Sequence, residues 1–375
     1  MYIKPGAMLG LLGGGQLGRM FVMAAQQMGY RVTVLDPATE SPAGSVAERH
    51  LQADYLDEQA LDELKSTCAA VTIEFENVPA RALRYLAEHC IVSPGAESVS
   101  IAQNRILEKQ FLAENNFPIG PFTVIRDEQD ISRIDTSLIP GILKASQFGY
   151  DGKGQISVDD AGSLPEAFSK LGNKPCVLEK RLPLDREISV ILARDNLNQI
   201  ALFPVPENRH EQGILDMSIV PAALPDEIIG KARTIAQQIA IRLNYIGVLC
   251  VEFFVLADGK VLVNEIAPRP HNSGHYSLNA CITSQFEQQV RVLCGLPHGS
   301  TQLIQAAVMT NILGDLWKNG DPDWSLILGN PQAKLHLYGK HEAKPGRKMG
   351  HFTVLADTVE QAMQQSTQIR SALRR

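Results

Sequence analysis

The stretch CVEFFVLADGKVLVNEIAPRPHNSGH, residues 250–275, carries the most information about the fold. Two apolar runs flank the turn sequence ADG, a pattern that predicts a hairpin of two antiparallel strands. Each run holds one glutamate, Glu252 in the first and Glu265 in the second, and Asn264 adds a neutral oxygen. Two carboxylates on one face repel each other unless a divalent cation lies between them. We therefore expect Glu252 and Glu265 to bind Mg²⁺; the alternative is that one or both project to solvent from an edge strand.

The loop after this hairpin is rich in groups that bind anions and move protons. Its two prolines and its glycine impose an irregular path beside the predicted metal. Arg269 could bind a carboxylate or bicarbonate, and His271 could move a proton. Asn272 and Ser273 could orient a substrate. A lone arginine or histidine is usually structural, but this cluster next to two carboxylates indicates a catalytic site.

The N-terminal sequence MLGLLGGGQLG, residues 8–18, predicts a strand, a glycine turn and a helix. A second predicted strand ends at Asp36, and the alternation of strands and helices continues to about residue 95, which indicates a Rossmann-like α/β domain with a parallel sheet. The spacing GxGxxG with Asp36 matches the dinucleotide fingerprint, so an NAD-dependent oxidoreductase is one alternative. The glycines could equally serve close packing of strand and helix, whereas Gln16 and Leu17 would offer backbone donors to a ligand.

A second glycine-rich loop, FGYDGKGQ at residues 148–155, follows an apolar strand that contains Lys144. Such a loop can fold over phosphates, although an exposed hairpin is the ordinary alternative. Lys144 would be costly to bury without an anion, and a nucleotide phosphate would supply one. Residues 179–182 could read an adenine edge and Glu187 could bind a ribose, but on these residues alone a solvated charged turn is the better interpretation.

The rest of the chain predicts an α+β region and a separate C-terminal segment. A helix is expected over residues 98–115, and strands are expected at 141–144, 176–179, 187–192, 247–256, 260–266 and 333–338. The C-terminal segment, from about residue 300, carries the basic turn 340–348. Lys340, Arg347 and Lys348 in this turn would hold a substrate phosphate, or they are simply a solvated surface turn.

Composition excludes several classes of protein. The 375 residues are 45% hydrophobic and 20% charged, with a formal net charge of −6, which argues against disorder and against nonspecific binding to nucleic acid. The six cysteines form no CxxC pair and no zinc-type cluster, so we expect reduced thiols in the cytoplasm. No apolar stretch is long enough for a membrane helix, and no signal peptide is expected.

Four blocks resemble the N5-carboxyaminoimidazole ribonucleotide synthetase family of ATP-grasp enzymes: GGGQLGRM at 13–20, FGYDGKGQ at 148–155, NEIAPRPHNSGH at 264–275 and PGRKMGH at 345–351. The resemblance implies a Rossmann-like preATP-grasp domain (1–100), an ATP-grasp domain (101–298) and a small C-terminal domain (299–375). It also implies ATP- and bicarbonate-dependent carboxylation of 5-aminoimidazole ribonucleotide through carboxyphosphate, in purine biosynthesis, by a homodimer that uses ATP and Mg²⁺.

The resemblance further implies residue roles. Contacts with ATP are implied for Arg105, Lys144, Gly149, Tyr150, Asp151, Gly152, Lys153, Gly154, Gln155, Glu179, Lys180, Arg181, Leu182, Glu187, Asn264 and Glu265. Contacts with the ribonucleotide are implied for Gln16, Leu17, Glu76, Tyr150, Asp151 and Lys153, with Lys340, Arg347 and Lys348 on its phosphate. Bicarbonate and the reacting amine would be surrounded by Arg269, His271, Asn272 and Ser273. The implied catalytic residues are Asp151, Lys153, Arg269 and His271, and either His271 or the released phosphate would accept the proton of the amine.

Two departures from the family pattern affect these roles. Glu207 stands where some members carry a histidine near ATP, and we therefore leave it out of the predicted site. Lys153 replaces an arginine found in many members, which removes a bidentate donor. Other interpretations are a formate-dependent glycinamide ribonucleotide transformylase, a biotin carboxylase-like ligase, and a sensing module that binds ATP without turnover.

Overall fold

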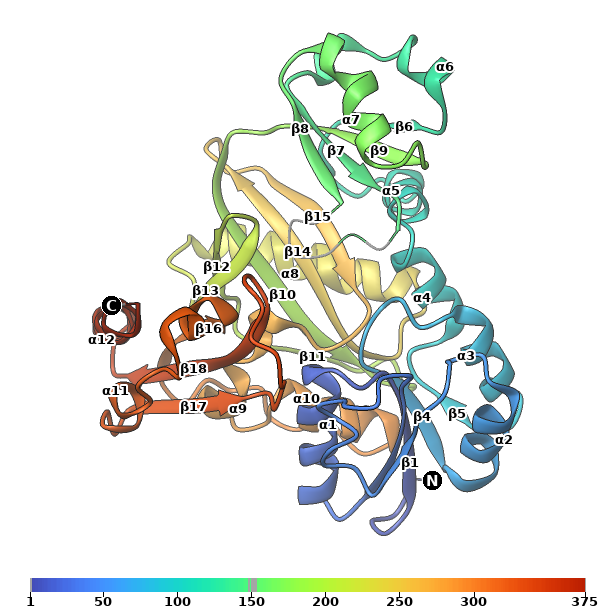
Figure 1. Ribbon diagram of the computed structural model, residues 1–375, viewed down its shortest axis with the longest axis vertical. Helices are drawn as coiled ribbons and strands as arrows, with labels where there is room; N and C mark the ends of the chain where they lie inside the picture. The colour runs from blue at the N-terminus through green and yellow to red at the C-terminus, as the bar shows by residue number, and fades with distance from the viewer. Residues whose placement is uncertain (1, 148, 150–153, 375) are drawn as a thin grey trace.

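The computed structural model describes residues 2–147, 149 and 154–374. These residues form three sheets: a five-stranded sheet at the N-terminus, a four-stranded sheet in a small lobe, and a nine-stranded sheet that contains the C-terminal strands. Figure 1 shows the small lobe at the top of the molecule and the two larger sheets below it. None of the helices in the described part of the chain has the length and apolar character needed to cross a bilayer.

The N-terminal unit confirms the predicted parallel α/β arrangement, with the strand order β3-β2-β1-β4-β5. Gly13, which ends the first strand, has a φ of +105°, a conformation that glycine adopts readily. The apolar faces of the helices pack on the sheet around Leu11, Val34 and Leu61. The elements are β1 (Met8–Leu12), α1 (Gln16–Gln27), β2 (Arg31–Leu35), β3 (Arg49–Leu51), α2 (Glu58–Thr67), β4 (Ala70–Ile73), α3 (Ala80–Ala87) and β5 (Ile91–Val92).

The single helix expected over residues 98–115 is wrong, because two helices occupy this region. They are α4 (Ala96–Ala102) and α5 (Arg105–Glu114). The side chain of Asn104 accepts hydrogen bonds from the backbone of Ile106 and Leu107 and so caps the start of the second helix. The break brings Arg105 to the first turn of α5.

The small lobe is a four-stranded antiparallel sheet in the order β6-β9-β7-β8. Its own core contains Leu143, Phe168 and Leu178. The strands predicted at 141–144 and 176–179 are confirmed as β7 and β9. The elements are β6 (Phe122–Ile125), α6 (Glu128–Ile131), η1 (Thr136–Leu138), β7 (Gly141–Ala145), β8 (Gln155–Val158), η2 (Ala161–Ser163), α7 (Leu164–Lys170) and β9 (Cys176–Lys180).

The central part of the nine-stranded sheet contains the predicted hairpin, formed by β14 and β15. The helix α8 packs against this part of the sheet around Ala236 and Ile239. The helix α10 packs against α1 and thereby joins the sheet to the N-terminal unit. The elements are β10 (Leu184–Arg194), β11 (Ile200–Leu202), β12 (Glu207–Glu211), β13 (Ile214–Val220), α8 (Asp226–Arg242), β14 (Gly247–Leu256), β15 (Val261–Ala267), η3 (Asn272–Gly274), α9 (Ser277–Ala280) and α10 (Gln285–Leu293).

The C-terminal strands extend this same sheet, so the expected C-terminal segment shares its sheet with the central part of the chain. The strand order is β15-β14-β10-β12-β13-β16-β18-β17, with β11 paired to β10. The join is the antiparallel pairing of β13 with β16. The domain limits at residues 100 and 298 stay a prediction. The elements are β16 (Ala306–Leu313), η4 (Gly314–Asn319), α11 (Ser325–Leu328), β17 (Ala333–Leu337), β18 (Lys348–Ala356) and α12 (Val359–Leu373).

Candidate active site

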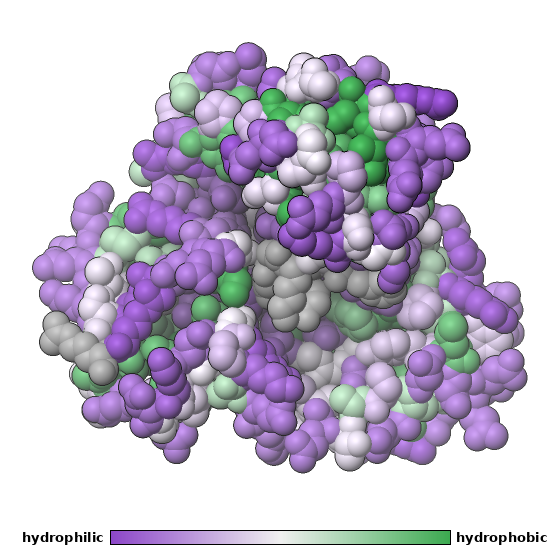
Figure 2. Space-filling view, turned by 45° about the horizontal axis from the view of Figure 1, so that its top comes forward, coloured by the Kyte–Doolittle hydropathy of each residue, from purple (hydrophilic) through white to green (hydrophobic). Residues whose placement is uncertain are grey.

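A cavity of about 750 Å³ lies where the three sheets meet. Figure 2 shows that the molecule is hollowed between the small lobe and the parts below it, and that hydrophilic residues predominate on this face. Most of the predicted site residues that the structure describes line the cavity: Gln16, Leu17, Glu76, Arg105, Lys144, Gly149, Gly154, Gln155, Glu187, Glu252, Asn264, Glu265, Arg269, His271, Asn272, Lys340, Arg347 and Lys348. The predicted residues Tyr150, Asp151, Gly152 and Lys153 lie outside the described residues.

The acidic hairpin places Glu252 on β14 directly opposite Glu265 on β15. The register shifts after this pair, so β15 carries one extra residue, and the consecutive Asn264 and Glu265 both line the cavity. Burial, together with the neighbouring Glu265, raises the pKa of Glu252. The buried Oδ1 of Asn264 has no hydrogen-bond partner among the described residues.

This donor set fits Mg²⁺. Magnesium uses one or two protein carboxylates and takes its other oxygens from water and substrate phosphates. The described part of the chain contains no group of three or more histidine, cysteine, aspartate or glutamate side chains arranged around a common metal position. A two-carboxylate site therefore suits a cation that arrives with a phosphate.

Three cations surround Glu179 at the end of β9. The Oε2 atom of Glu179 lies 3.1 Å from Nζ of Lys144 and 3.4 Å from Nζ of Lys109, and Arg105 approaches Oε1 at 3.8 Å. Burial alone would raise the pKa of Glu179, but Lys144, Lys109 and Arg105 hold it at about 2. Burial lowers the pKa of Lys144. Lys109 was not predicted from the sequence, although it lies four residues after Arg105 and therefore on the same face of α5.

The predicted adenine-binding stretch, residues 179–182, does not contribute to the lining of the cavity. Glu179, Lys180, Arg181 and Leu182 are absent from the described lining, and the carboxylate of Glu179 faces cations instead of the cavity. Arg181 forms an ion pair of 2.8 Å with Asp159. The adenine contact of the four side chains thus stays a prediction without support from their positions.

Glu187 lines the cavity, and Oε2 of this residue lies 3.3 Å from Nδ1 of His210 on β12. Hydrogen bonding and the charge of Glu187 outweigh the effect of burial and raise the pKa of His210. Glu207, which stands where some members of the family carry a histidine and is left out of the predicted site, pairs with Arg186 and Arg209. His210, three residues later, is the histidine of β12 that lines the cavity, and the register shift between β12 and β13 just before it makes this hard to predict.

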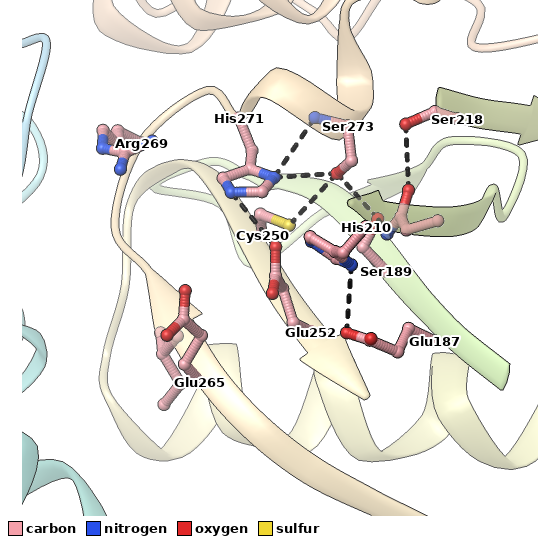
Figure 3. A network of polar contacts seen from close by, with 12 residues as sticks. Glu187, Ser189, His210, Ser218, Cys250, Glu252, Glu265, Arg269, His271 and Ser273 are labelled. Atoms are coloured by element: carbon pink, nitrogen blue, oxygen red, sulfur yellow. Dashed lines mark hydrogen bonds and ion pairs between the residues drawn. The ribbon is translucent and has the colours of Figure 1, made fainter. Parts of the chain in front are cut away.

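The loop after β15 brings Arg269 and His271 to the cavity. Arg269 pairs with Glu76 of the N-terminal unit, and the charge and hydrogen bonding of Arg269 hold the pKa of the half-buried Glu76 below its ordinary value. His271 lies between Glu252 and Ser273: its Nε2 is 3.2 Å from Oε1 of Glu252, and its Nδ1 is 2.8 Å from Oγ of Ser273 (Figure 3). Burial, followed by the charge of Arg269, lowers the pKa of His271 well below its usual range.

Ser273 does not take the predicted position on a substrate. Its side chain is completely buried beneath His271, and it is absent from the lining of the cavity. The short helical turn η3 that begins after His271 turns the hydroxyl of Ser273 back toward the histidine. A contact between Ser273 and bicarbonate or the amine is therefore wrong for its side chain.

Cations from the C-terminal turn line the other end of the cavity. Nζ of Lys340 donates a 2.8 Å hydrogen bond to the carbonyl of Lys348, and Arg347 donates one to the carbonyl of Glu342. These contacts hold the turn in one shape. The predicted cluster of Lys340, Arg347 and Lys348 is thus brought to one wall of the cavity.

Two side-chain carboxylates of the protein accept hydrogen bonds from the backbone of the glycine turn before α1. Glu74, directly after β4, accepts hydrogen bonds of 2.8 Å from Gly15 and 3.0 Å from Gly18, and Asp36 accepts one of 2.7 Å from Gly14. These are the backbone donors that would face a dinucleotide phosphate. An NAD-binding role for the turn is therefore wrong, because side chains of the protein occupy it. The sequence held a signal for Glu74, since it lies at the carboxyl end of a parallel strand.

We predict that Gly15→Ala destabilises the protein, because a Cβ at Gly15 would lie 2.3 Å from Oε1 of Glu74. The matched control is Gly95→Ala: Gly95 also precedes a helix and has a similar φ, but its Cβ would meet nothing within 4 Å. Chemical denaturation should give Gly15→Ala a free energy of unfolding about 1–3 kcal/mol lower than that of Gly95→Ala. Equal values would contradict the close contact.

Comparisons with known protein families divide the chain into three matched parts. Residues 7–103 match the ribonucleotide synthetase preATP-grasp domain, and residues 110–286 match the ATP-grasp domain. Residues 307–365 match the phosphoribosylaminoimidazole carboxylase C-terminal domain. The order agrees with the three units expected from the sequence.

Similar proteins cover almost the whole chain. The N5-carboxyaminoimidazole ribonucleotide synthase of Bacillus subtilis (strain 168) is 42% identical over 97% of this chain and 96% of its own length. A solved ADP complex of N5-carboxyaminoimidazole ribonucleotide synthetase superposes with a TM-score of 0.92 at 40% identity, covering 98% of this chain and 97% of that one. The Aspergillus clavatus enzyme in complex with ADP and 5-aminoimidazole ribonucleotide has a TM-score of 0.89 at 31% identity, with 98% of each chain covered. On the strength of this full-length similarity and of the cavity that its four sequence blocks share, the chain belongs to the N5-carboxyaminoimidazole ribonucleotide synthase family of ATP-grasp enzymes.

Proposed function

We propose that this enzyme carboxylates the amine of 5-aminoimidazole ribonucleotide with bicarbonate, at the expense of ATP, in purine biosynthesis. The observation that carries the proposal is a single cavity shared by the acidic hairpin, Lys144, the loop with Arg269 and His271, and the basic C-terminal turn. Groups suited to a triphosphate, a small carboxylate and a sugar phosphate thus face one space. Relatives solved with ATP, or with ADP and 5-aminoimidazole ribonucleotide, agree with this set of ligands.

ATP would lie between the small lobe and the acidic hairpin. Lys144, Arg105 and the backbone of the loop 149–155 would face its phosphates, and Glu187 would face the ribose. Glu252 and Glu265, with Asn264 beside them, would hold Mg²⁺ that enters with the nucleotide. When bound, the metal would offset the negative charge of the phosphates during phosphoryl transfer.

Bicarbonate would lie beside Arg269 and His271. Bicarbonate is a poor electrophile, so one of its oxygens first takes the γ-phosphoryl group of ATP, which gives carboxyphosphate and ADP. Arg269 would bind the carboxylate oxygens through its planar donors while Lys144 stabilises the charge of the moving phosphoryl group. Carboxyphosphate hydrolyses readily, so the loop 149–155 and the walls of the cavity would need to exclude water until carbon dioxide reaches the amine.

The ribonucleotide would span the cavity from Gln16, Leu17 and Glu76 to the basic turn. Lys340, Arg347 and Lys348 would bind its phosphate. Tyr150, Asp151 and Lys153 are proposed contacts as well, with Asp151 orienting the amine, although they fall in the part of the loop that the structure leaves undescribed. We also propose that the enzyme is a homodimer in the cytoplasm; six free cysteines fit a reducing compartment.

The test is release of phosphate from ATP with each substrate omitted in turn. We expect sustained release, with N5-carboxyaminoimidazole ribonucleotide as product, only when bicarbonate and 5-aminoimidazole ribonucleotide are both present. Dependence on formate and glycinamide ribonucleotide, or on biotin, would assign one of the other ATP-grasp activities. Binding of ATP without any release of ADP would indicate a sensing module.

Asp151→Ala is expected to uncouple hydrolysis from carboxylation, because the amine would lose the group proposed to orient it. The ratio of ATP hydrolysis with the ribonucleotide to hydrolysis without it should fall by about tenfold. Parallel assays of phosphate and of carboxylated product measure this ratio. An unchanged ratio would remove Asp151 from the amine site.

A further inference from the structure

A row of buried polar side chains crosses three adjacent strands of the large sheet, β13, β12 and β10, and reaches His271 through Ser273 of η3. Figure 3 shows the chain of contacts from Ser218 to the histidine. Oγ of Ser218 lies 2.9 Å from Oδ1 of Asn208, Nδ2 of Asn208 lies 3.0 Å from Oγ of Ser189, and the hydroxyls of Ser189 and Ser273 are 2.7 Å apart. All four side chains are 5% exposed or less. Burying polar side chains costs free energy of desolvation, and apolar residues could fill the same space. The row therefore points to a role other than stabilising the fold.

The backbone N–H of Ser273 sets the direction of the hydrogen bonds in this row. The N–H of Ser273 donates to Nδ1 of His271 at 3.3 Å. A backbone N–H can only donate, so Nδ1 must be the acceptor and carries no proton. The hydroxyl of Ser273, 2.8 Å from the same nitrogen, therefore donates to it as well and accepts from Ser189 on its other side. Ser189 in turn accepts from the amide of Asn208, and every donor in the row points toward the histidine.

The other ring nitrogen faces Glu252, which also lines the cavity. With Nδ1 unprotonated, the proton of neutral His271 is on Nε2, which lies 3.2 Å from Oε1 of Glu252. The backbone of His271 is fixed too, because the amide of Gln285 accepts from its N–H at 2.9 Å and donates to its carbonyl at 2.7 Å. Neutral His271 thus offers an N–H and has no free lone pair.

We infer that Ser273 and Ser189 are positioning residues that hold His271 in the Nε2-protonated form, so that His271 donates a hydrogen bond to bicarbonate and to carboxyphosphate instead of serving as a base. This inference rests on the proposed function. When the nitrogen of the amine forms its bond to the carbon of carbon dioxide, the proton it loses goes to the phosphate dianion released from carboxyphosphate. His271 keeps its own proton throughout.

The first test reads the tautomer directly. The intact enzyme, labelled with ¹⁵N in its nine histidines, is examined by NMR, and the His271 signals are assigned by their loss in His271→Gln. We expect a proton on Nε2 in the wild type. In Ser273→Ala the backbone N–H of residue 273 still donates to Nδ1 but the shorter hydroxyl contact is lost, so a minor Nδ1-protonated population should become detectable. A wild-type enzyme with the proton on Nδ1 would overturn the inference.

The second test is kinetic. Ser273→Ala and Ser189→Ala should each lower kcat about tenfold while the KM for ATP changes by less than about twofold, since the histidine is misplaced but the nucleotide site is not. The matched control is Ser366→Ala, which also removes a fully buried serine from a 2.7 Å hydroxyl pair, with Thr310, in the C-terminal segment. If both serine variants have the same kcat as the control, the positioning role is contradicted.

A third comparison separates a donor from a base. His271→Gln keeps an N–H but has no basic nitrogen, whereas His271→Leu has neither. A donor role predicts that the glutamine variant retains at least about tenfold more activity than the leucine variant. Equal inactivity of the two would support a base and contradict the inference. If the wild-type enzyme releases no phosphate with bicarbonate and the ribonucleotide, the proposed function fails instead, and the NMR result still stands by itself.

Discussion

Glu265→Gln is expected to reduce turnover by about 100-fold or more at ordinary magnesium concentrations. The substitution keeps the size of the side chain but replaces a charged oxygen ligand with an amide. It also removes one of the two carboxylate partners of Arg105, whose Nη2 lies 3.2 Å from Oε2 of Glu265. Affinity for the magnesium–ATP complex should fall, and raising the magnesium concentration should recover only part of the lost activity. Steady-state assays at several magnesium concentrations, with direct titration of the nucleotide, measure both effects.

Glu287→Gln is the matched control for this experiment. Glu287 has a similarly exposed side chain, 30% against 37% for Glu265, and it also pairs with one arginine, Arg291, at 2.8 Å. It lies on α10, outside the cavity, so its loss should leave turnover and the magnesium dependence unchanged. Near-normal activity of Glu265→Gln under the same conditions would refute a ligand role for Glu265.

Glu179→Gln is expected to cause the largest loss of stability, about 3–5 kcal/mol in the free energy of unfolding. The carboxylate is the shared partner of Lys144, Lys109 and Arg105, and the lysines are 8% and 1% exposed. Glutamine would leave the two buried lysines without this anion, while Arg105 keeps its ion pair with Glu265. Because β9 belongs to the small lobe and α5 lies outside it, the lobe should loosen first. Chemical denaturation and hydrogen exchange of the lobe would show this.

The effect of Glu179→Gln should depend on pH in a defined direction. The pKa of Glu179 is lowered to about 2 in the folded protein, so its contribution is complete above the unfolded value near 4.5 and is lost as the pH falls toward 2. The difference between wild type and variant should therefore shrink in acid. Glu166→Gln, which breaks a solvent-exposed pair with Lys170 in the same lobe, should leave stability nearly unchanged. Similar losses in both variants would contradict the importance of the buried cluster.

Much of this architecture could be predicted from local pattern. The hairpin of β14 and β15 was predictable because apolar runs flank a clear turn, and the N-terminal parallel sheet because strands and helices alternate there. The bulge that turns Asn264 and Glu265 to the same side was not predictable, since it depends on pairing between strands. The pairing of β13 with β16 was not predictable either, because neither segment carries a sequence signal for its partner strand.

The site shows the same division. Residue types that stand out in an apolar setting, such as Lys144 and Glu252, were identified from the sequence. Their surroundings were not predictable, because they depend on contacts between distant parts of the chain. Glu179 contacts Lys144 from 35 positions away, and Glu74 accepts from the backbone of Gly15 and Gly18 from more than 50 positions away. Ser273 was misjudged for a related reason: in sequence it is one polar residue of a polar loop, and only the fold turns it inward.

The continuous sheet from β15 to β17 fixes the spacing of the chemistry. The acidic hairpin is at one edge of this hydrogen-bonded slab, and Lys348 begins a strand close to the other edge. Sliding these edges relative to each other would break several ladders of backbone hydrogen bonds at once. The distance between the acidic hairpin and the basic turn is therefore set when the chain folds, whereas the four-stranded lobe, which is a separate sheet, is not held by these ladders.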